Sequence, residues 1–209
     1  LVVERFDRKI APNGEWIMRL PQEDFCQVTG VPSILKYESD GGPGLQTLFN
    51  TLQQSENSAT DLRTLMATQI LFWLLRAPDG HAKNFSIQLL PRGRFRLAPL
   101  YDVMSAYPVM GKGPHQWSSK QIKLSMALLG KNRHYSMDSI VRRHFKSTAK
   151  HLGYEEYIEP LIEDLLARTP AVIERVSKKL PDGFSSHVAE TVLDGLEKAA
   201  KKLGSMQTS

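Results

Sequence analysis

The first hundred residues alternate short apolar runs with turn signals, and this pattern predicts short strands around one long buried helix. Leu1–Phe6 is expected to form a short apolar strand, and Asn13-Gly14 is a strong signal for a hairpin turn. After Thr60 or Asp61, either of which could cap a helix, apolar residues cover most of a helical circumference as far as Arg76. A helix that is apolar nearly all round is typical of a buried one.

Proline and glycine divide the rest of the chain into hairpin, loop and helical parts. A helix is expected from about Leu45 to Gln54, and short strands at Phe85–Leu90 and Phe95–Leu100. Residues 101–120 are expected to be rich in loops. The last third of the chain has helical spacing in four segments. These lie near 136–152, 154–168, 170–180 and 185–203, and Pro160, Pro170 and Pro181 are expected to interrupt them. The sequence therefore predicts a mostly α-helical fold with short β-hairpins.

Composition narrows the class of protein. The 209 residues are 41% hydrophobic and 23% charged, as in ordinary globular proteins and unlike disordered or collagen-like chains. The single cysteine, Cys26, cannot form an internal disulfide, so a reducing, cytoplasmic compartment is expected. No run of about 18 apolar residues occurs, so no membrane span is expected. The chain opens on Leu1-Val2-Val3 without a methionine, and we expect it to be part of a longer protein.

Positive charge is concentrated in one stretch, residues 112–150. The chain carries +5 overall, from 27 basic and 22 acidic residues. Within the stretch, the only acidic residue is Asp138. Its nine basic residues are Lys112, Lys120, Lys123, Lys131, Arg133, Arg142, Arg143, Lys146 and Lys150. Such a stretch is either a solvated helix face or a surface that meets a polyanion.

The candidate chemistry lies just after the buried helix. Asp79 and Asn84 have the D-x-x-x-x-N spacing of a kinase catalytic loop, and Asp102 follows after the length of a hairpin. Phosphoryl transfer needs an aspartate that orients the attacking hydroxyl, with an amide oxygen and a second carboxylate that hold Mg²⁺ against the phosphates. Each of these residues alone could equally be a turn or cap residue. Lys83 could neutralise phosphate charge or be a solvated lysine, and His81 is expected to be structural rather than a base or zinc ligand.

Four segments, in order, resemble the HipA family, the serine/threonine kinase toxins of bacterial HipBA toxin–antitoxin modules. They are Val3–Arg8, Arg19–Asp24, Lys36–Gly44 and Asp79–Phe85. The resemblance runs to about residue 190 and implies the C-terminal lobe of a protein-kinase-like, HipA-type fold. Residues 1–20 would be a hinge strand and hairpin at the junction with an N-terminal lobe absent from this chain. Residues 21–209 would be the α-helical kinase lobe, with a catalytic loop at 79–84 and a metal-binding segment at 101–102.

The resemblance also implies roles for individual residues. Asp79 matches the catalytic aspartate, while Asn84 and Asp102 match the ligands of Mg²⁺. The backbone of residues 4–6 matches the hinge that holds adenine. The residues implied to contact ATP are Glu4, Arg5, Phe6, His81, Ala82, Lys83, Asn84, Tyr101 and Asp102.

A biological setting follows from the same resemblance. The best-known target in the family is a translation component, glutamyl-tRNA synthetase, whose phosphorylation leads to growth arrest and persistence. The kinase binds a small helix-turn-helix antitoxin, HipB, which carries it to operator DNA. Two basic residues of the family contact that DNA. Lys150 matches the first, whereas Gly153 stands where the second is expected, which weakens the expectation of direct DNA contact.

The chain departs from the family pattern in one further respect. The family's phosphate-gripping loop, ATP-pairing lysine and autophosphorylated serine lie upstream of the hinge, where this chain begins. We therefore expect residues 1–209 alone to be inactive as a kinase. Gly41-Gly42-Pro43-Gly44 is no substitute, because it lacks the Lys-Ser/Thr that closes a phosphate loop and could simply begin a helix.

Two other functions stay open. A DNA-associated co-repressor subunit would use the basic stretch and keep only vestigial catalysis. A small-molecule phosphotransferase would use a similar Asp/Asn/Asp set. The intact set of Asp79, Asn84 and Asp102 favours an active kinase over the first alternative, and the four HipA-like segments favour a protein kinase over the second.

Overall fold

The computed structural model describes residues 3–207, which form two compact units. The first unit contains the residues up to Leu62 together with His81–Asp102. The second contains Arg63–Gly80 and the chain from Val103 onward. The long helix α3 (Ser58–Leu74) contributes its first residues to the first unit and the remainder to the second.

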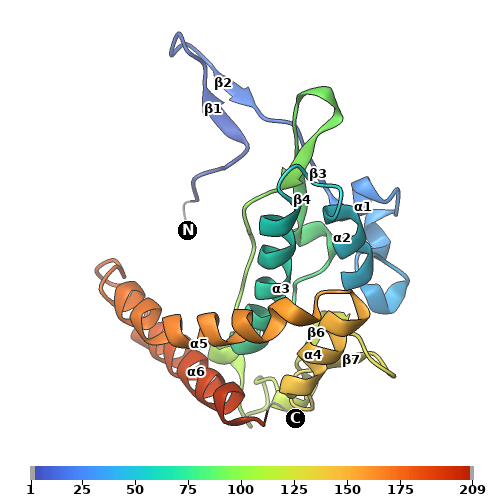
Figure 1. Ribbon diagram of the computed structural model, residues 1–209. Coiled ribbons are helices and arrows are strands. Elements are labelled where there is room, and N and C mark those ends of the chain that lie inside the picture. The colour runs from blue at the N-terminus through green and yellow to red at the C-terminus, as the bar shows by residue number, and fades with distance from the viewer. Residues whose placement is uncertain (1–2, 208–209) are drawn as a thin grey trace. The chain divides into compact units, whose positions relative to one another are not determined.

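The first unit begins with the predicted hairpin (Figure 1). Strands β1 (Arg8–Ile10) and β2 (Ile17–Arg19) pair antiparallel, and Gly14 in the turn has a φ of 74°, which suits glycine. The hairpin prediction is confirmed. The predicted strand at Leu1–Phe6 is wrong for residues 3–6, and its first two residues lie outside the described part of the chain. Residues 3–6 have no strand beside them within the described residues, and a strand needs one to satisfy its backbone groups.

A three-stranded antiparallel sheet forms the centre of the first unit. Its order is β3 (Gln22–Asp24), β4 (Ser86–Leu89), β5 (Phe95–Leu97), so the predicted hairpin at 85–100 is confirmed with shorter strands. The short helix α1 (Phe25–Val28) follows β3 directly, and α2 (Leu45–Leu52) matches the predicted helix. The core of this unit includes the buried side chains Phe25, Leu45, Leu48, Phe49, Leu52, Phe85 and Leu97.

The glycine-rich segment before α2 is a packed turn. A Cβ on Gly42 would lie 1.9 Å from the Leu35 carbonyl oxygen, so only glycine allows the two backbones to approach. Gly44 is the N-terminal cap of α2. The expectation that this segment begins a helix is confirmed.

The start of α3 differs from its prediction. The helix begins at Ser58, and Asp61 lies in its first turn rather than at its cap. The buried Asp61 carboxylate accepts hydrogen bonds from the Leu97 backbone N–H, at 2.8 Å, and from the Ser55 hydroxyl. This carboxylate therefore fixes β5 to the beginning of α3, because a buried charge must be fully hydrogen-bonded.

The second unit is mainly helical. Its helices are α4 (Arg142–His151), α5 (Glu155–Ser177) and α6 (Ser186–Ser205), and α5 and α6 lie side by side (Figure 1). A strand pair, β6 (Lys123–Leu128) and β7 (His134–Ser136), was not predicted. The predicted helical start near residue 136 is therefore wrong by about one and a half turns.

Helix α5 continues through two prolines that were expected to punctuate it. Pro160 and Pro170 lie within the helix with exposed side chains, whereas Ile158, Leu161 and Ile162 are buried on its other face. Burial of that face outweighs the lost backbone hydrogen bonds, so the break predicted before residue 170 is wrong.

Trp73 anchors the core of the second unit. Its indole N–H donates to the Met137 carbonyl at 2.9 Å, and its ring meets the Phe145 ring edge-on with centroids 6.2 Å apart. The fold is thus mostly helical with short antiparallel strand pairs, as predicted. Within residues 3–207, none of the helices combines the length and apolar composition needed to cross a bilayer.

Candidate functional site

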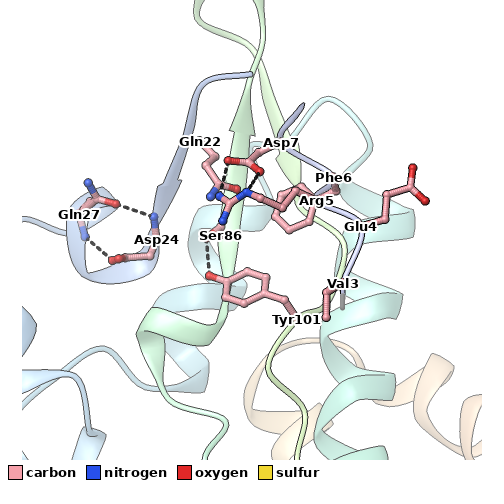
Figure 2. A pocket seen from close by; sticks show the side chains of 10 residues that line it. All are labelled: Val3, Glu4, Arg5, Phe6, Asp7, Gln22, Asp24, Gln27, Ser86 and Tyr101. Atoms are coloured by element: carbon pink, nitrogen blue, oxygen red, sulfur yellow. Dashed lines mark hydrogen bonds and ion pairs between the residues drawn. The ribbon is translucent and has the colours of Figure 1, made fainter. Parts of the chain in front are cut away.

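A pocket of about 480 Å³ lies in the first unit (Figure 2). The N-terminal segment forms one wall, β3 and the start of α1 another, and the beginning of β4 with Tyr101 the rest. Its lining residues are Val3, Glu4, Arg5, Phe6, Asp7, Gln22, Asp24, Gln27, Ser86 and Tyr101. The structure therefore brings four of the predicted nucleotide-binding residues, Glu4, Arg5, Phe6 and Tyr101, to one cavity.

Asp7 holds the N-terminal segment in place. Its side chain is 2% exposed and accepts two hydrogen bonds from the Arg5 guanidinium, at 2.7 and 2.8 Å, and one from Arg8. The hydrogen bond from Arg5 outweighs the opposing effect of burial and, with the positive charges of Arg5 and Arg8, lowers the pKa of Asp7 to about 2. The Asp7 backbone carbonyl also accepts from the Leu20 N–H at 2.8 Å, which joins the segment to the chain after β2.

Tyr101 connects the pocket to the predicted catalytic loop. Its hydroxyl donates to the Lys83 carbonyl at 2.7 Å and is 2.6 Å from the Ser86 hydroxyl. Its ring stacks on Phe6 with centroids 5.8 Å apart. Burial raises the pKa of Tyr101, so the hydroxyl stays protonated and able to donate. The aromatic pair places two of the predicted residues, Phe6 and Tyr101, face to face.

Lys83 forms an ion pair within this unit. Its Nζ lies 2.6 Å from Oδ2 of Asp24, and the Asp24 side chain also accepts from the Gln27 backbone N–H as the cap of α1. The hydrogen bond to Asp24 raises the pKa of Lys83. Lys83 is therefore a held cation rather than a solvated loop lysine.

Gln22 adds a polar group that the sequence did not single out. Its side-chain Oε1 is buried at the pocket and, among the described residues, has no hydrogen-bond partner. A buried carbonyl without a donor is costly, so a donor on a bound molecule would be favoured there. Gln22 belongs to the Arg19–Asp24 segment, whose resemblance signalled importance without indicating a role.

The predicted catalytic loop is shaped by contacts within each unit. In the second unit, half-buried Asp79 stands between Pro78, whose carbonyl accepts from the Ser125 hydroxyl at 2.5 Å, and Gly80. A Cβ on Gly80 would lie 2.0 Å from the Phe72 ring, so the close approach requires glycine.

The remainder of this loop belongs to the first unit. His81 meets the Tyr37 ring edge-on at 5.0 Å, and the Ala82 N–H donates to the Lys36 carbonyl at 3.3 Å. The 3₁₀ helix η3 (Ala82–Asn84) follows, and it leaves the Asn84 side chain buried. The packing of His81 is consistent with the expected structural role.

Asp102 has an exposed side chain on a left-handed backbone, with φ of 55°. A non-glycine residue in this conformation is uncommon, although aspartate tolerates it better than most, and such strain is often found at functional sites. The carboxylate of Asp102 and the amide oxygen of Asn84 are hard oxygen donors of the kind that Mg²⁺ prefers. Among residues 3–207, no group of three or more His, Cys, Asp or Glu side chains could hold a metal ion.

Seven of the nine basic residues of the stretch 112–150 are exposed, whereas Lys146 is half-buried and Arg142 is buried. Lys150 is exposed in the last turn of α4. Arg142 is buried, and its guanidinium bonds to Glu159, at 3.0 Å from Nε, and to Glu163. Arg142 therefore joins α4 to α5 and is unavailable to an external polyanion.

Comparison with known proteins gives this site a context. The model of the HipA-like C-terminal domain family matches residues 1–173. The Sinorhizobium fredii protein Y4mE, whose name describes a candidate kinase, is 44% identical over 111 residues, covering 52% of this chain and 26% of its own length. The serine/threonine-protein kinase toxin HipA of Shewanella oneidensis is 28% identical over 116 residues, covering 50% of this chain and 27% of its own length.

A solved structure has the same fold. A chain of the Shewanella oneidensis complex of HipA, HipB and operator DNA superposes with a TM-score of 0.77 at 21% identity, over 96% of this chain and 48% of that one. The chain thus spans less than half the length of each of these relatives.

Proposed function

The chain belongs to the HipA-like C-terminal domain family, and on this premise we propose that it carries the nucleotide-binding and catalytic groups of a HipA-type serine/threonine protein kinase. Relatives named as kinases support this activity. The observation that carries the proposal is the pocket of the first unit, in which the wall at residues 3–7 faces Tyr101, and Tyr101 in turn bonds to the backbone of Lys83 in the predicted catalytic loop.

The pocket suits the base of ATP. The rings of Phe6 and Tyr101 offer flat apolar surfaces, and the open Oε1 of Gln22 can accept a hydrogen bond from an amino group. The backbone of residues 4–6 supplies further polar groups at the pocket wall. An adenine has the aromatic faces and the amino donor that these groups would recognise.

Asp79 is the proposed catalytic residue. A carboxylate in a kinase loop orients the substrate hydroxyl and accepts its proton as the oxygen attacks the γ-phosphate. Its position depends on neighbours with little freedom, because Pro78 is bonded to Ser125 and Gly80 packs against Phe72. A fixed backbone on both sides restricts where the carboxylate can point.

Asn84 and Asp102 are the proposed ligands of Mg²⁺. When bound, the ion would offset negative charge on the β- and γ-phosphates. Lys83 keeps its charge through the ion pair with Asp24, so its cation remains beside this loop.

The proposed setting follows the family. We place the protein in the cytoplasm, with a HipB-like antitoxin and operator DNA as partners, since the similar structure is a complex of HipA, HipB and operator DNA. The proposed target is a translation component such as glutamyl-tRNA synthetase, with growth arrest as the consequence.

The experiment is transfer of labelled γ-phosphate from ATP to protein by the complete protein. Asp79→Asn should lower the rate by about 10²–10⁴-fold, while the circular dichroism spectrum stays unchanged. The matched control is Asp182→Asn, which removes an exposed carboxylate between α5 and α6. Near wild-type labelling by Asp79→Asn would overturn the assignment. Transfer only to a small-molecule acceptor would favour the phosphotransferase alternative, and no transfer by the wild type would favour the co-repressor.

A further inference from the structure

The second unit contains a smaller pocket of about 200 Å³ that the proposed kinase chemistry does not use. Trp73 and Tyr107 supply aromatic walls, and Arg76, Lys198 and Lys202 supply positive charge. The pocket shares no residue with the nucleotide pocket of the first unit. The proposed kinase chemistry therefore does not explain why these aromatic and basic side chains line one pocket.

Arg76 is held in an unusual conformation at this pocket. It lies two residues after the end of α3 and has a φ of 51°, which is uncommon for a residue with a side chain. Its Nη2 donates to Oδ1 of Asp138 at 2.7 Å. Its Nη1 is buried and, within the described residues, lacks any hydrogen-bond partner. A buried guanidinium N–H without a partner is unfavourable, so an acceptor on a bound molecule would be favoured at Nη1.

Asp138 does not bond to Nη1 in the structure. Its Oδ1 accepts from Nη2 of Arg76, and its Oδ2 accepts from the Ser119 hydroxyl at 2.7 Å. Burial alone would raise the pKa of Asp138, but the hydrogen bonds from Ser119 and Arg76 outweigh it and lower the pKa. Asp138 is therefore charged at neutral pH and offsets one of the three cations.

Two cations remain to be balanced. Lys198 and Lys202 are four residues apart on α6, so they project from one face of the helix. The Lys202 ammonium lies 6.0 Å from the centroid of the Trp73 ring, at the outer range of a cation–π contact. Gly195 lets this part of α6 approach Tyr107, because a Cβ there would lie 2.6 Å from that ring.

We propose that this pocket binds a phosphate group, either as the free ion or on a phosphorylated side chain. A phosphate monoester carries about −1.5 to −2 charge at pH 7, which matches the excess of two cations. A guanidinium N–H aimed at a phosphate oxygen forms a strong charge-assisted bond and would satisfy Arg76. The small volume suits a phosphate and a short stem rather than a whole nucleotide.

The test is calorimetric titration of the purified protein with inorganic phosphate, a phosphoserine peptide and the same peptide without phosphate. The double variant Lys198→Gln/Lys202→Gln should weaken phosphate binding about 10-fold or more. Arg76→Gly should do the same without backbone strain, because glycine accepts the left-handed conformation. The control is Lys201→Gln, on the same helix but outside the pocket.

The titrations distinguish a free phosphate ion from a phosphorylated side chain. Equal affinity of the phosphate and the phosphopeptide, with both lost in the variants, identifies the free ion as sufficient. Tighter binding of the phosphopeptide, with no binding of the plain peptide, identifies a phosphorylated side chain. The proposal is overturned if the wild type binds neither, if the lysine variant binds as well as the wild type, or if the plain peptide binds equally. The readout is binding at a separate pocket, so it does not depend on kinase activity.

Discussion

At the scale of single residues, the Asp7 carboxylate links the pocket wall to pH. Its folded-state pKa is about 2, below the ordinary value near 4, because Arg5 and Arg8 stabilise its charged form. A group with a depressed pKa contributes stability above its unfolded pKa and loses that contribution as pH falls through the folded pKa. The contribution of Asp7 is thus complete at neutral pH and disappears between about pH 4 and pH 2.

We therefore expect Asp7→Asn to destabilise the protein at pH 6 and to have little effect near pH 2. The measurement is urea unfolding at a series of pH values for both proteins. The control is Asp40→Asn, which removes an exposed carboxylate of the same unit. A stability difference that stays constant from pH 6 to pH 2 would contradict the role of the Asp7 charge.

Gly80 gives a second prediction at this scale. The Cβ of Gly80→Ala would overlap the Phe72 ring, so the loop or the ring must move, at a cost of about 1–3 kcal/mol. The displaced loop should also lower phosphoryl transfer, since Gly80 adjoins Asp79. The measurements are unfolding midpoint and labelling rate.

Gly204→Ala is the matched control for this change. Its new Cβ would meet only Leu166, at an ordinary 3.6 Å, within α6. Alanine should be neutral or stabilising there. Combining Gly80→Ala with Phe72→Leu should restore part of the lost rate, and a Gly80→Ala protein with normal rate and stability would refute the steric argument.

At the scale of elements, α5 continues through proline at a measurable cost. Pro170 is exposed in the helix interior, where proline is about 3 kcal/mol less favourable than alanine. Replacing proline by alanine also raises the conformational entropy of the unfolded chain, and this lowers the gain in stability by about 0.4–1 kcal/mol. We expect Pro170→Ala to raise the free energy of unfolding by about 2–3 kcal/mol. Pro181→Ala, between α5 and α6, is the control and should give no such gain; equal effects of both would indicate that α5 carries no strain at Pro170.

The elements that could be predicted from sequence were those with local signals. Asn13-Gly14 fixed one hairpin by its turn chemistry, and Pro91–Gly93 separated the strands of another. The pair β6 and β7 was missed because a short apolar run does not distinguish a strand from a buried helix. The error at Pro170 has the opposite cause, since burial on the far side of α5 overrides a local signal.

The candidate site likewise has features that the sequence suggests and features that only the structure reveals. The spacing of Asp79 and Asn84 could be noticed along the chain, because the proposed catalytic loop is continuous in sequence. The roles of Asp7 and Gln22 could not, because their burial depends on Arg5, Arg8 and the pocket walls, which come from separate segments. The sequence alone could propose the loop, whereas the hydrogen bonds around Asp7 and the isolation of Gln22 Oε1 required the fold.

At the scale of the whole molecule, the net charge of +5 attracts any polyanion, so affinity alone cannot identify a DNA contact. The dependence of affinity on salt is more specific. Each phosphate neutralised by a lysine or arginine releases counterions and steepens the slope of log affinity against log salt by about 0.9. The loss of a single phosphate contact is therefore visible as a change in this slope, even when the other charged residues keep the complex bound.

Lys150→Ala tests whether this residue contacts DNA, with the protein in complex with the proposed antitoxin and the proposed operator DNA. If Lys150 contacts a phosphate, the slope between 50 and 200 mM salt should become shallower by about 1. Its position in the last turn of α4 also stabilises that helix by roughly 0.3–1 kcal/mol, so a modest loss of stability is expected in either case and is not evidence for contact. The control is Lys179→Ala, an exposed lysine outside the basic stretch that should leave the slope unchanged. Because Gly153 offers no second charge, an unchanged slope with Lys150→Ala would mean that this end of α4 makes no phosphate contact and that Lys150 belongs to a solvated face.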